Sequence, residues 1–129
     1  MRLLNELGAS SSILRASARG AALRNEIISS NLATADVPGF TARGVEFEER
    51  LAERIGNWRP RVKPTDLEDF EAAVFFRYER TQMRNDGSNL DIDAEMVALY
   101  QNQMKFETML ASLTANSERM QTVLRQGGG

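Results

Sequence analysis

Carboxylates are the main candidates for chemistry in this chain, because it contains no histidine and no cysteine. Thiolate nucleophiles, imidazole acid–base catalysis, disulfides and the usual zinc ligand sets are therefore excluded. The densest acidic group is Asp91–Glu95, but a calcium loop would need oxygen ligands over about a dozen residues and a closing glutamate. We therefore expect Asp91 to cap a helix, with Asp93 and Glu95 in its first turn, where acids suit the helix dipole.

The other motifs that suggest chemistry have simpler interpretations. Glu48 and Glu49 are expected at a solvated surface. Gly87, within the polar cluster Asn85–Asn89, predicts a turn, because the spacing of a phosphate-binding loop and a preceding buried strand are both missing. We expect no catalytic residues, no cofactor and no metal site, and an enzyme is the least favoured class.

Charge and hydropathy exclude further classes. The 129 residues include 16 basic and 18 acidic ones with interspersed signs, which is no nucleic-acid footprint. Four arginines near the N-terminus predict a solvated helix face: Arg2, Arg15, Arg19 and Arg24. We find neither an apolar run long enough to span a bilayer nor a cleavable secretory signal. The protein is thus expected to stay in the cytoplasm or to leave it without a cleaved signal.

The first of three zones, residues 1–35, predicts an N-terminal assembly helix. Small and apolar residues recur there at intervals of three and four, which marks one face of an amphipathic helix from about Ser10. Ser10–Ser12 offer an N-cap. Because the residues of this face are small, we expect another helix to pack closely against it. The face comprises Ile13, Ala16, Gly20, Leu23 and Ile27.

A chain reversal is predicted where this helix ends. The residue before a proline is pushed out of the helical conformation, so the helix must end before Pro38. Pro38 fixes one φ angle and Gly39 permits a positive one, which is typical of a turn over Asp36–Phe40. Phe40 is then expected to dock beside the end of the helix.

The middle zone, residues 36–89, predicts an irregular segment with short β structure. Val45–Leu51 fits either a short strand or a helical turn. Trp58–Pro64 is expected to be extended, because its two prolines prevent a helix. Ala73–Tyr78 is the best strand candidate, since it is rich in β-branched and aromatic residues.

The third zone, residues 90–129, predicts a long helix with a coiled-coil seam. About 33 helical residues would span roughly 50 Å, more than the diameter of a small domain, so partners are implied. Gln103 and Ser117 interrupt the seam, and they either fix its register or lie at an exposed edge. The seam positions alternate at intervals of four and three: Ile92, Met96, Leu99, Gln103, Phe106, Leu110, Leu113, Ser117, Met120 and Leu124.

The turn and its flanks resemble the bacterial flagellar rod and hook family, in which a helix ends in a run like N-[I/L]-A-N-A-[D/N]-T-P-G-[Y/F]. Thr34 and Val37 depart from that pattern. Two further segments, Thr41–Glu48 and Arg84–Met96, are similar to stretches of proximal rod subunits, although Gly44 replaces an expected acid. The matching residues of the first run are Asn31, Leu32, Ala33, Ala35, Asp36, Pro38, Gly39 and Phe40.

This resemblance implies a structural subunit whose terminal helices pair as a coiled coil in the wall of a tube. It also implies export by the flagellar type III apparatus without a cleaved signal peptide and assembly in the periplasmic rod. Partners implied are copies of itself, other rod subunits, the rod–ring adaptor subunit, and the export gate with the inner-membrane ring. A proximal rod subunit of C type and a cytoplasmic helical export chaperone or adaptor are the alternatives.

We therefore expect a mostly α fold: long N- and C-terminal helices pairing as a coiled coil, with a partly extended or disordered middle segment that has room for a short β-hairpin. The expected function is structural, transmitting torque as part of the rod. The expected turn motif is Asn31, Ala33, Asp36, Pro38, Gly39 and Phe40. The expected helix-packing seams are Ile13, Leu23 and Ile27 on one helix, and Leu99, Phe106, Leu110 and Leu113 on the other.

Overall fold

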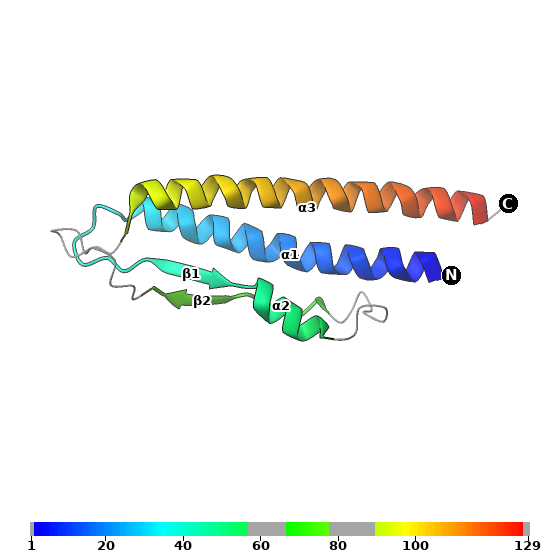
Figure 1. Ribbon diagram of the computed structural model, residues 1–129, viewed down its shortest axis with the longest axis horizontal. Helices are drawn as coiled ribbons and strands as arrows, with labels where there is room; N and C mark the ends of the chain where they lie inside the picture. The colour runs from blue at the N-terminus through cyan, green and yellow to red at the C-terminus, as the bar shows by residue number, and fades with distance from the viewer. Residues whose placement is uncertain (1, 57–66, 78–89, 128–129) are drawn as a thin grey trace.

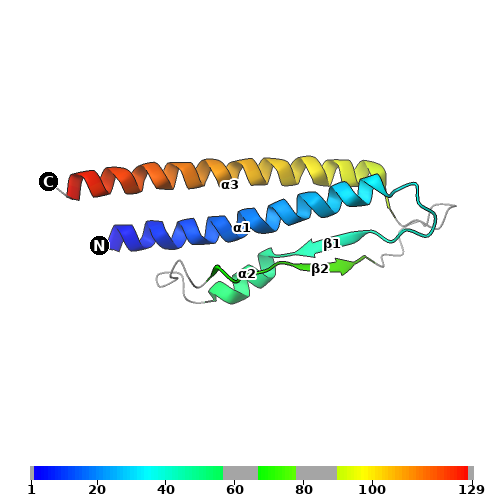
Figure 2. The same cartoon turned by 180° about the vertical axis from the view of Figure 1, so that it is seen from behind.

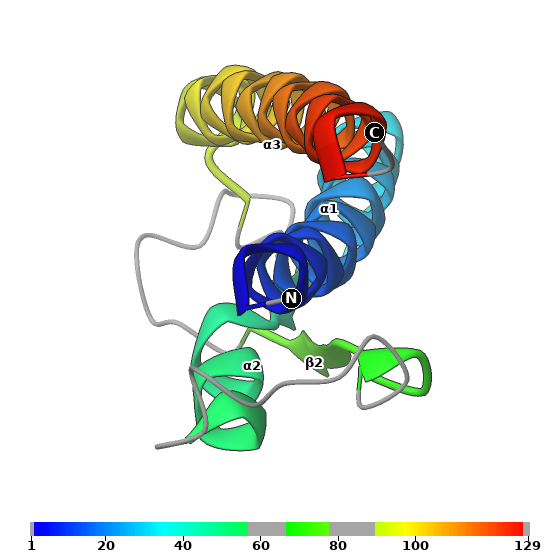
Figure 3. The same cartoon turned by 90° about the vertical axis from the view of Figure 1, so that its right-hand side faces the viewer.

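Two long helices dominate the computed structural model, which describes residues 2–56, 67–77 and 90–127. Helices α1 (Arg2–Ala33) and α3 (Ile92–Gly127) run antiparallel, so both termini lie at one end of the molecule (Figures 1 and 2). Between them in sequence come β1 (Arg43–Glu46), α2 (Glu48–Ile55) and β2 (Ala73–Phe76). These form a layer on the other side of α1 from α3 (Figure 3). The expected mostly helical class with long terminal helices is confirmed.

Helix α1 is longer than its sequence pattern indicates. It begins at Arg2, so the prediction that Ser10–Ser12 cap its N-terminus is wrong. The hydroxyl of Ser12 instead donates a hydrogen bond of 3.0 Å to the carbonyl of Gly8, one turn earlier. This bond satisfies the serine inside the helix without a cap. The helix ends at Ala33, before Pro38, as predicted.

The face of α3 turned toward α1 keeps the predicted heptad period but holds polar residues. The Asn102 amide donates to the carbonyl of Ala21 over 2.7 Å, and the Asn116 amide donates to the Ser10 hydroxyl over 3.2 Å. Buried amides that bond to one partner favour a single register. The buried and half-buried positions with this spacing are Glu95, Leu99, Asn102, Phe106, Met109, Leu113, Asn116, Met120 and Val123.

The predicted seam of α3 is therefore divided. Four of its members are half-buried on this inner face: Leu99, Phe106, Leu113 and Met120. The other six are exposed in the single chain: Ile92, Met96, Gln103, Leu110, Ser117 and Leu124. Gln103 and Ser117 thus lie at an exposed edge within the chain.

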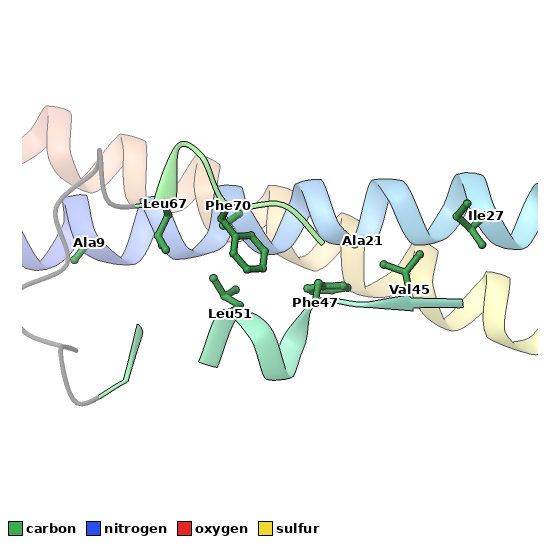
Figure 4. Close-up of a cluster of buried hydrophobic side chains, with 9 residues drawn as sticks. Ala9, Ala21, Ile27, Val45, Phe47, Leu51, Leu67 and Phe70 are labelled. Atoms are coloured by element: carbon green, nitrogen blue, oxygen red, sulfur yellow. The ribbon is translucent and has the colours of Figure 1, made fainter. Parts of the chain in front are cut away.

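Phe47 is the centre of the main core. It is 1% exposed and packs among Leu51, Leu67 and Phe70 against α1 (Figure 4). Gly20 makes room for it: a β-carbon there would lie 2.4 Å from Cγ of Phe47. The small face of α1 therefore receives an aromatic ring of the middle segment at this point, where the pattern alone suggested another helix.

The middle segment contains the β-hairpin for which the sequence left room. Strands β1 and β2 pair antiparallel, with Val45 opposite Val74. The segment Val45–Leu51 proves to be both alternatives in succession, since β1 ends at Glu46 and α2 begins at Glu48. The extended stretch predicted for Trp58–Pro64 and the turn predicted for Asn85–Asn89 lie outside the described residues. Of the helices described, none combines the length and the apolarity needed to cross a bilayer.

Candidate assembly interface

The turn after α1 has the predicted conformation. Gly39 has a φ of 73°, and the N–H of Phe40 donates to the carbonyl of Val37 over 3.2 Å, which places Pro38 and Gly39 at the two central turn positions. Phe40 is half-buried and packs against a small cluster that includes Leu90, the residue two before α3. The turn thereby links the end of α1 to the start of α3.

Asn31 holds the first residue of β1 as a neighbouring strand would. Its side chain is fully buried; Oδ1 accepts from the N–H of Arg43 over 3.0 Å and Nδ2 donates to the carbonyl of Arg43 over 2.8 Å. Both backbone groups of Arg43 are thus satisfied by one amide, which fixes the distance between α1 and the hairpin. The resemblance singled out Asn31, and the structure gives it this positioning role.

Glu95 extends this contact to α3. It is 3% exposed, forms an ion pair with Arg77 just after β2, and accepts from Nδ2 of Asn31 over 3.4 Å. The N–H of Arg77 in turn donates to the carbonyl of Ala42 over 2.8 Å. We call Asn31, Arg77 and Glu95 the polar clamp, because they join both helices and the hairpin at one end of the molecule.

The sequence signal for the clamp was incomplete. Asp91 caps α3 as predicted, its Oδ1 accepting from the N–H of Ala94 over 3.2 Å. Glu95, however, is turned inward to Arg77 rather than serving only the helix dipole. A charged residue in a helix first turn gives no sign of a partner 18 residues earlier, so only the position of Glu95 in the heptad could have suggested it.

Arg24 is a second anchor between α1 and the middle segment. Its guanidinium forms two hydrogen bonds to the Glu48 carboxylate, of 2.5 and 2.6 Å, and a third of 2.9 Å to the carbonyl of Val45. It also lies 4.5 Å from the centre of the Phe47 ring, a cation–π distance. The hydrogen bond from Arg24 lowers the pKa of the Glu48 carboxyl, against the opposing effect of its partial burial.

The predicted solvated surface is confirmed in part, since Arg19 and Glu48 are exposed and Arg24 is half-buried. Arg24 is engaged as described, and Arg19 donates to the carbonyl of Leu67 over 2.6 Å. Glu48 is the partner of Arg24 rather than a free surface acid. Charge patterning could not reveal these contacts, because each joins residues more than 20 positions apart in the sequence.

Helix α3 leaves a broad apolar face uncovered. Val97, Tyr100 and Met104 are 56, 58 and 62% exposed, and we call these three the helix patch. Helical geometry at 100° per residue puts them on the side opposite Leu99 and Asn102, which face α1. Further exposed apolar residues flank the patch along α3: Ile92, Met96, Leu110 and Leu124.

Apolar side chains are also exposed on the hairpin. Val74, Phe75 and Phe76 of β2 are 45, 46 and 58% exposed, and alternation along the strand puts Phe75 on the opposite side of the sheet from the other two. Exposed apolar residues scattered singly are ordinary, but contiguous ones mark interaction surfaces. The helix patch groups several such residues on one side of α3, whereas β2 divides its exposed apolar residues between its two sides.

The predicted site residues fall into three groups. The turn residues are mostly exposed, namely Ala33, Asp36, Pro38 and Gly39, while Asn31 is buried and Phe40 half-buried. The α1 residues Ile13, Leu23 and Ile27 belong to the Phe47 core. Of the α3 residues, Leu99, Phe106 and Leu113 face inward, and Leu110 is 43% exposed.

Paired terminal helices, the turn after α1 and the uncovered helix patch are typical of a helical structural subunit that assembles with partners. Comparison with known proteins places the chain among structural subunits of the flagellar rod. The chain is 32% identical over 124 residues to the flagellar basal body rod protein FlgB of Yersinia enterocolitica, covering 82% of this chain and 86% of that protein. It is 25% identical over 109 residues to FlgB of Bacillus subtilis, covering 81 and 84%. No model of a known protein family matches it.

The chain therefore belongs to the FlgB family of flagellar basal body rod proteins. This confirms the resemblance inferred from the turn motif and its flanks. FlgB of Borrelia hermsii is also similar: it is 35% identical over 95 residues, and the match covers 64% of this chain.

Proposed function

We propose that this chain is a structural subunit of the proximal rod, which assembles with copies of itself and with other rod subunits and transmits torque through the rod. The proposal includes the rod–ring adaptor subunit and the export gate with the inner-membrane ring as its neighbours. It also includes passage through the flagellar type III apparatus into the periplasm. Membership of the FlgB family supports the location in the rod, and the uncovered surface of α3 supports assembly with other subunits.

The observation that carries the proposal is the helix patch with its flanks on α3. A 36-residue helix is about 54 Å long, and seven large apolar side chains along it are more than a third exposed in the single chain. Apolar side chains exposed repeatedly along one helix are costly in water and are typical of a protein interface. Neighbouring subunits would cover it, so that assembly supplies the burial that a single chain lacks.

In the proposed subunit, the polar clamp and the turn make the end of the molecule rigid where α1 ends and α3 begins. Asn31, Gly39 and Phe40 set the direction in which the chain leaves α1, and Glu95 ties the same point to α3. In this proposal the turn residues orient the hairpin against the helices, and Leu110 with the outer face of α3 contacts neighbouring subunits.

Deletion of the coding sequence, followed by complementation with an epitope-tagged copy, tests the proposal. We expect non-motile cells without rods, restored motility on complementation, and the tagged chain in purified basal bodies. A Tyr100→Asp/Met104→Asp variant should fold but fail to restore rods, whereas Thr122→Asp, farther along the exposed side of α3, serves as the matched control. Deleted cells that keep intact rods would overturn the proposal. A tagged chain found only in the cytoplasm as a stable dimer would favour an export chaperone instead.

A further inference from the structure

A groove lies between α1, α2 and α3 on one side of the molecule. It has a volume of about 600 Å³ and runs beside α1 from Glu6 to Ser17. The end view shows α2 and α3 on different sides of α1, so these two helices form the rims of the groove (Figure 3). We call it the apolar groove, because large apolar side chains from all three helices line it, among them Ile13, Leu14, Leu51, Ile55 and Met109.

Lys105 is the positive charge on the α3 rim of this groove. It lies one helical turn before Met109, a groove residue. After the hydrogen bond from Arg24, the charge of Lys105 also lowers the pKa of Glu48, which lines the groove on the α2 rim. Glu6 and Glu48, the acids of the groove, each form an ion pair with an arginine of the same chain. Lys105 forms no ion pair among the residues that the structure describes.

The opposite side of α3 carries the exposed half of the predicted seam. Leu110 lies about 140° round the helix from Lys105, and it is 43% exposed. Glu107 borders this side, is exposed, and lies about 160° round the helix from Lys105. The residues of this side recur every seven positions, are uncharged and are exposed in the single chain. We call them the seam flank: Met96, Gln103, Leu110, Ser117 and Leu124.

Side-by-side copies that point the same way bring the seam flank and the groove together. Met109 in the groove and Leu110 on the flank are adjacent in sequence, so both lie at the same height along the molecule. Copies at equal height therefore place Leu110 against the groove of the next copy. The same displacement brings Glu107 of one copy to Lys105 of the next, because two residues of a helix differ by only about 3 Å along its axis.

The charges favour this parallel orientation over the reverse one. In parallel copies Glu107 faces the α3 rim, which carries Lys105. A reversed copy would exchange the two rims and turn Glu107 toward Glu48 on the α2 rim, a pair of like charges. Like charges brought together at an interface select against the wrong orientation.

From this arrangement we propose that the seam flank of one copy docks in the apolar groove of a second, parallel copy of this chain, with Glu107 paired to Lys105. The contact is heterologous, because each copy has one groove and one flank to offer, so it continues from subunit to subunit. This inference rests on the proposed rod function and names one of its contacts.

The area of the contact suits a row of subunits better than an isolated pair. The seam flank from Met96 to Leu124 is about 42 Å long, and a strip of one helix width presents on the order of 400 Å². A copy with neighbours on both sides would bury about twice that, close to the roughly 800 Å² per partner of a stable interface. An isolated pair buries half as much, so free subunits stay monomeric and the contact forms within the array.

Cross-linking of introduced cysteines tests the contact, because the chain has no cysteine of its own. Two differently tagged versions, Gln103→Cys on the seam flank and Ala52→Cys in the groove, are produced together in the bacterium and treated with a short bis-maleimide. We expect a cross-linked pair that carries both tags in the basal-body fraction. Either version produced alone should give no pair. Thr122→Cys, exposed on another side of α3, should give no pair with Ala52→Cys.

Exchange of the two charges makes the result specific. Glu107→Lys, introduced into both tagged versions, places two lysines together and should reduce the mixed pair about tenfold. Lys105→Glu should do the same by placing two glutamates together. The double variant Glu107→Lys/Lys105→Glu again has opposite charges between copies and should restore the pair. Both residues are exposed, so the single variants should fold, which circular dichroism checks.

Each outcome bears on one of the two proposals. A basal-body fraction that holds the chain without the mixed pair would overturn this inference and leave the rod function standing. A mixed pair that the single charge reversals leave unchanged, or that the exchange does not restore, would overturn it as well. Absence of the tagged parent chain from basal bodies would overturn the rod function itself.

Discussion

Replacing Gly20 with alanine should destabilise the fold, and the structure sets the size of the effect. The new β-carbon would lie 2.4, 2.6 and 2.8 Å from Cγ, Cδ2 and Cδ1 of Phe47. The ring is 1% exposed and enclosed by the core, so the ring or the helix must shift. Overpacking costs about 1–3 kcal/mol, and three contacts below 3.0 Å to an enclosed ring put this case in the upper part of the range, about 2–3 kcal/mol. Alanine gains about 1 kcal/mol over glycine in a helix interior, which leaves a net loss of about 1–2 kcal/mol.

Gly8 provides a matched control on the same helix. A β-carbon at Gly8 would meet no heavy atom within 4 Å, so Gly8→Ala should stabilise the chain by about 0.5–1 kcal/mol through helix propensity alone. The two alanine variants should therefore differ by about 2–3 kcal/mol in opposite directions from the parent.

Urea titration of the purified variants, followed by circular dichroism of the helices, measures the free energy of unfolding of each. A loss of 1–2 kcal/mol lowers the midpoint by about 0.5–1 M at a slope typical of small proteins. Combining Gly20→Ala with Phe47→Leu should remove most of the clash, so the two changes should not be additive. If Gly20→Ala were as stable as Gly8→Ala, the close approach of the ring to α1 would be refuted.

Three further changes test other contacts in the same titration. Because its arginine partner lowers the pKa of Glu48, the pair stabilises the fold near neutral pH and loses that contribution as the pH falls through the lowered pKa. Glu48→Gln should thus be less stable than the parent by under about 1 kcal/mol at pH 7 and equal to it in acid; an equal difference at both pH values would contradict this. Glu95→Gln removes the negative charge from the buried ion pair with Arg77 and should cost about 2 kcal/mol. Exposed Asp93→Asn in the same helical turn should cost less than about 1 kcal/mol; equal losses would contradict the role of the clamp. Gly39→Ala should cost about 1 kcal/mol by strain at a φ of 73°, and Gly39→Asn should cost less because asparagine tolerates that conformation.

The period of α3 could be predicted from the sequence, but the side that faces α1 could not. Apolarity alone favours Ile92, Met96 and Leu110 over Asn102 and Asn116, yet the asparagines are the buried ones. The reason is that α1 offers small residues and polar acceptors, such as the carbonyl of Ala21, at the contact. A hydrophobic pattern on one helix carries no information on what its partner presents.

The turn was predictable because its causes are local. Pro38 and Gly39 restrict their own backbone, and Asp91 caps the helix that follows it directly. The positions of Phe47 and Arg24 could not be predicted, since both depend on where α1 and the middle segment meet. Even there Gly20 was visible as a small residue on an apolar face, although the sequence could not say whether a ring or a helix would fill the space.

The two anchors explain why the middle segment stays with the helices. Arg24 joins α1 to the junction of β1 and α2, and the polar clamp joins both helices to the far end of the hairpin. Each anchor uses charged groups that form direct hydrogen bonds, so both fix the orientation of the middle segment and also stabilise the fold. The outer face of α3 has no comparable partner within the part of the chain that the structure describes.

Amide hydrogen exchange along α3 tests most directly whether that outer face is completed only by neighbouring subunits. The free chain and the same chain in purified basal bodies would be compared peptide by peptide. We expect α3 in the free chain to exchange orders of magnitude faster than in basal bodies, with the largest gain of protection over the helix patch. Equal protection in the two states would show that a lone chain already satisfies its long helices, and would contradict the account.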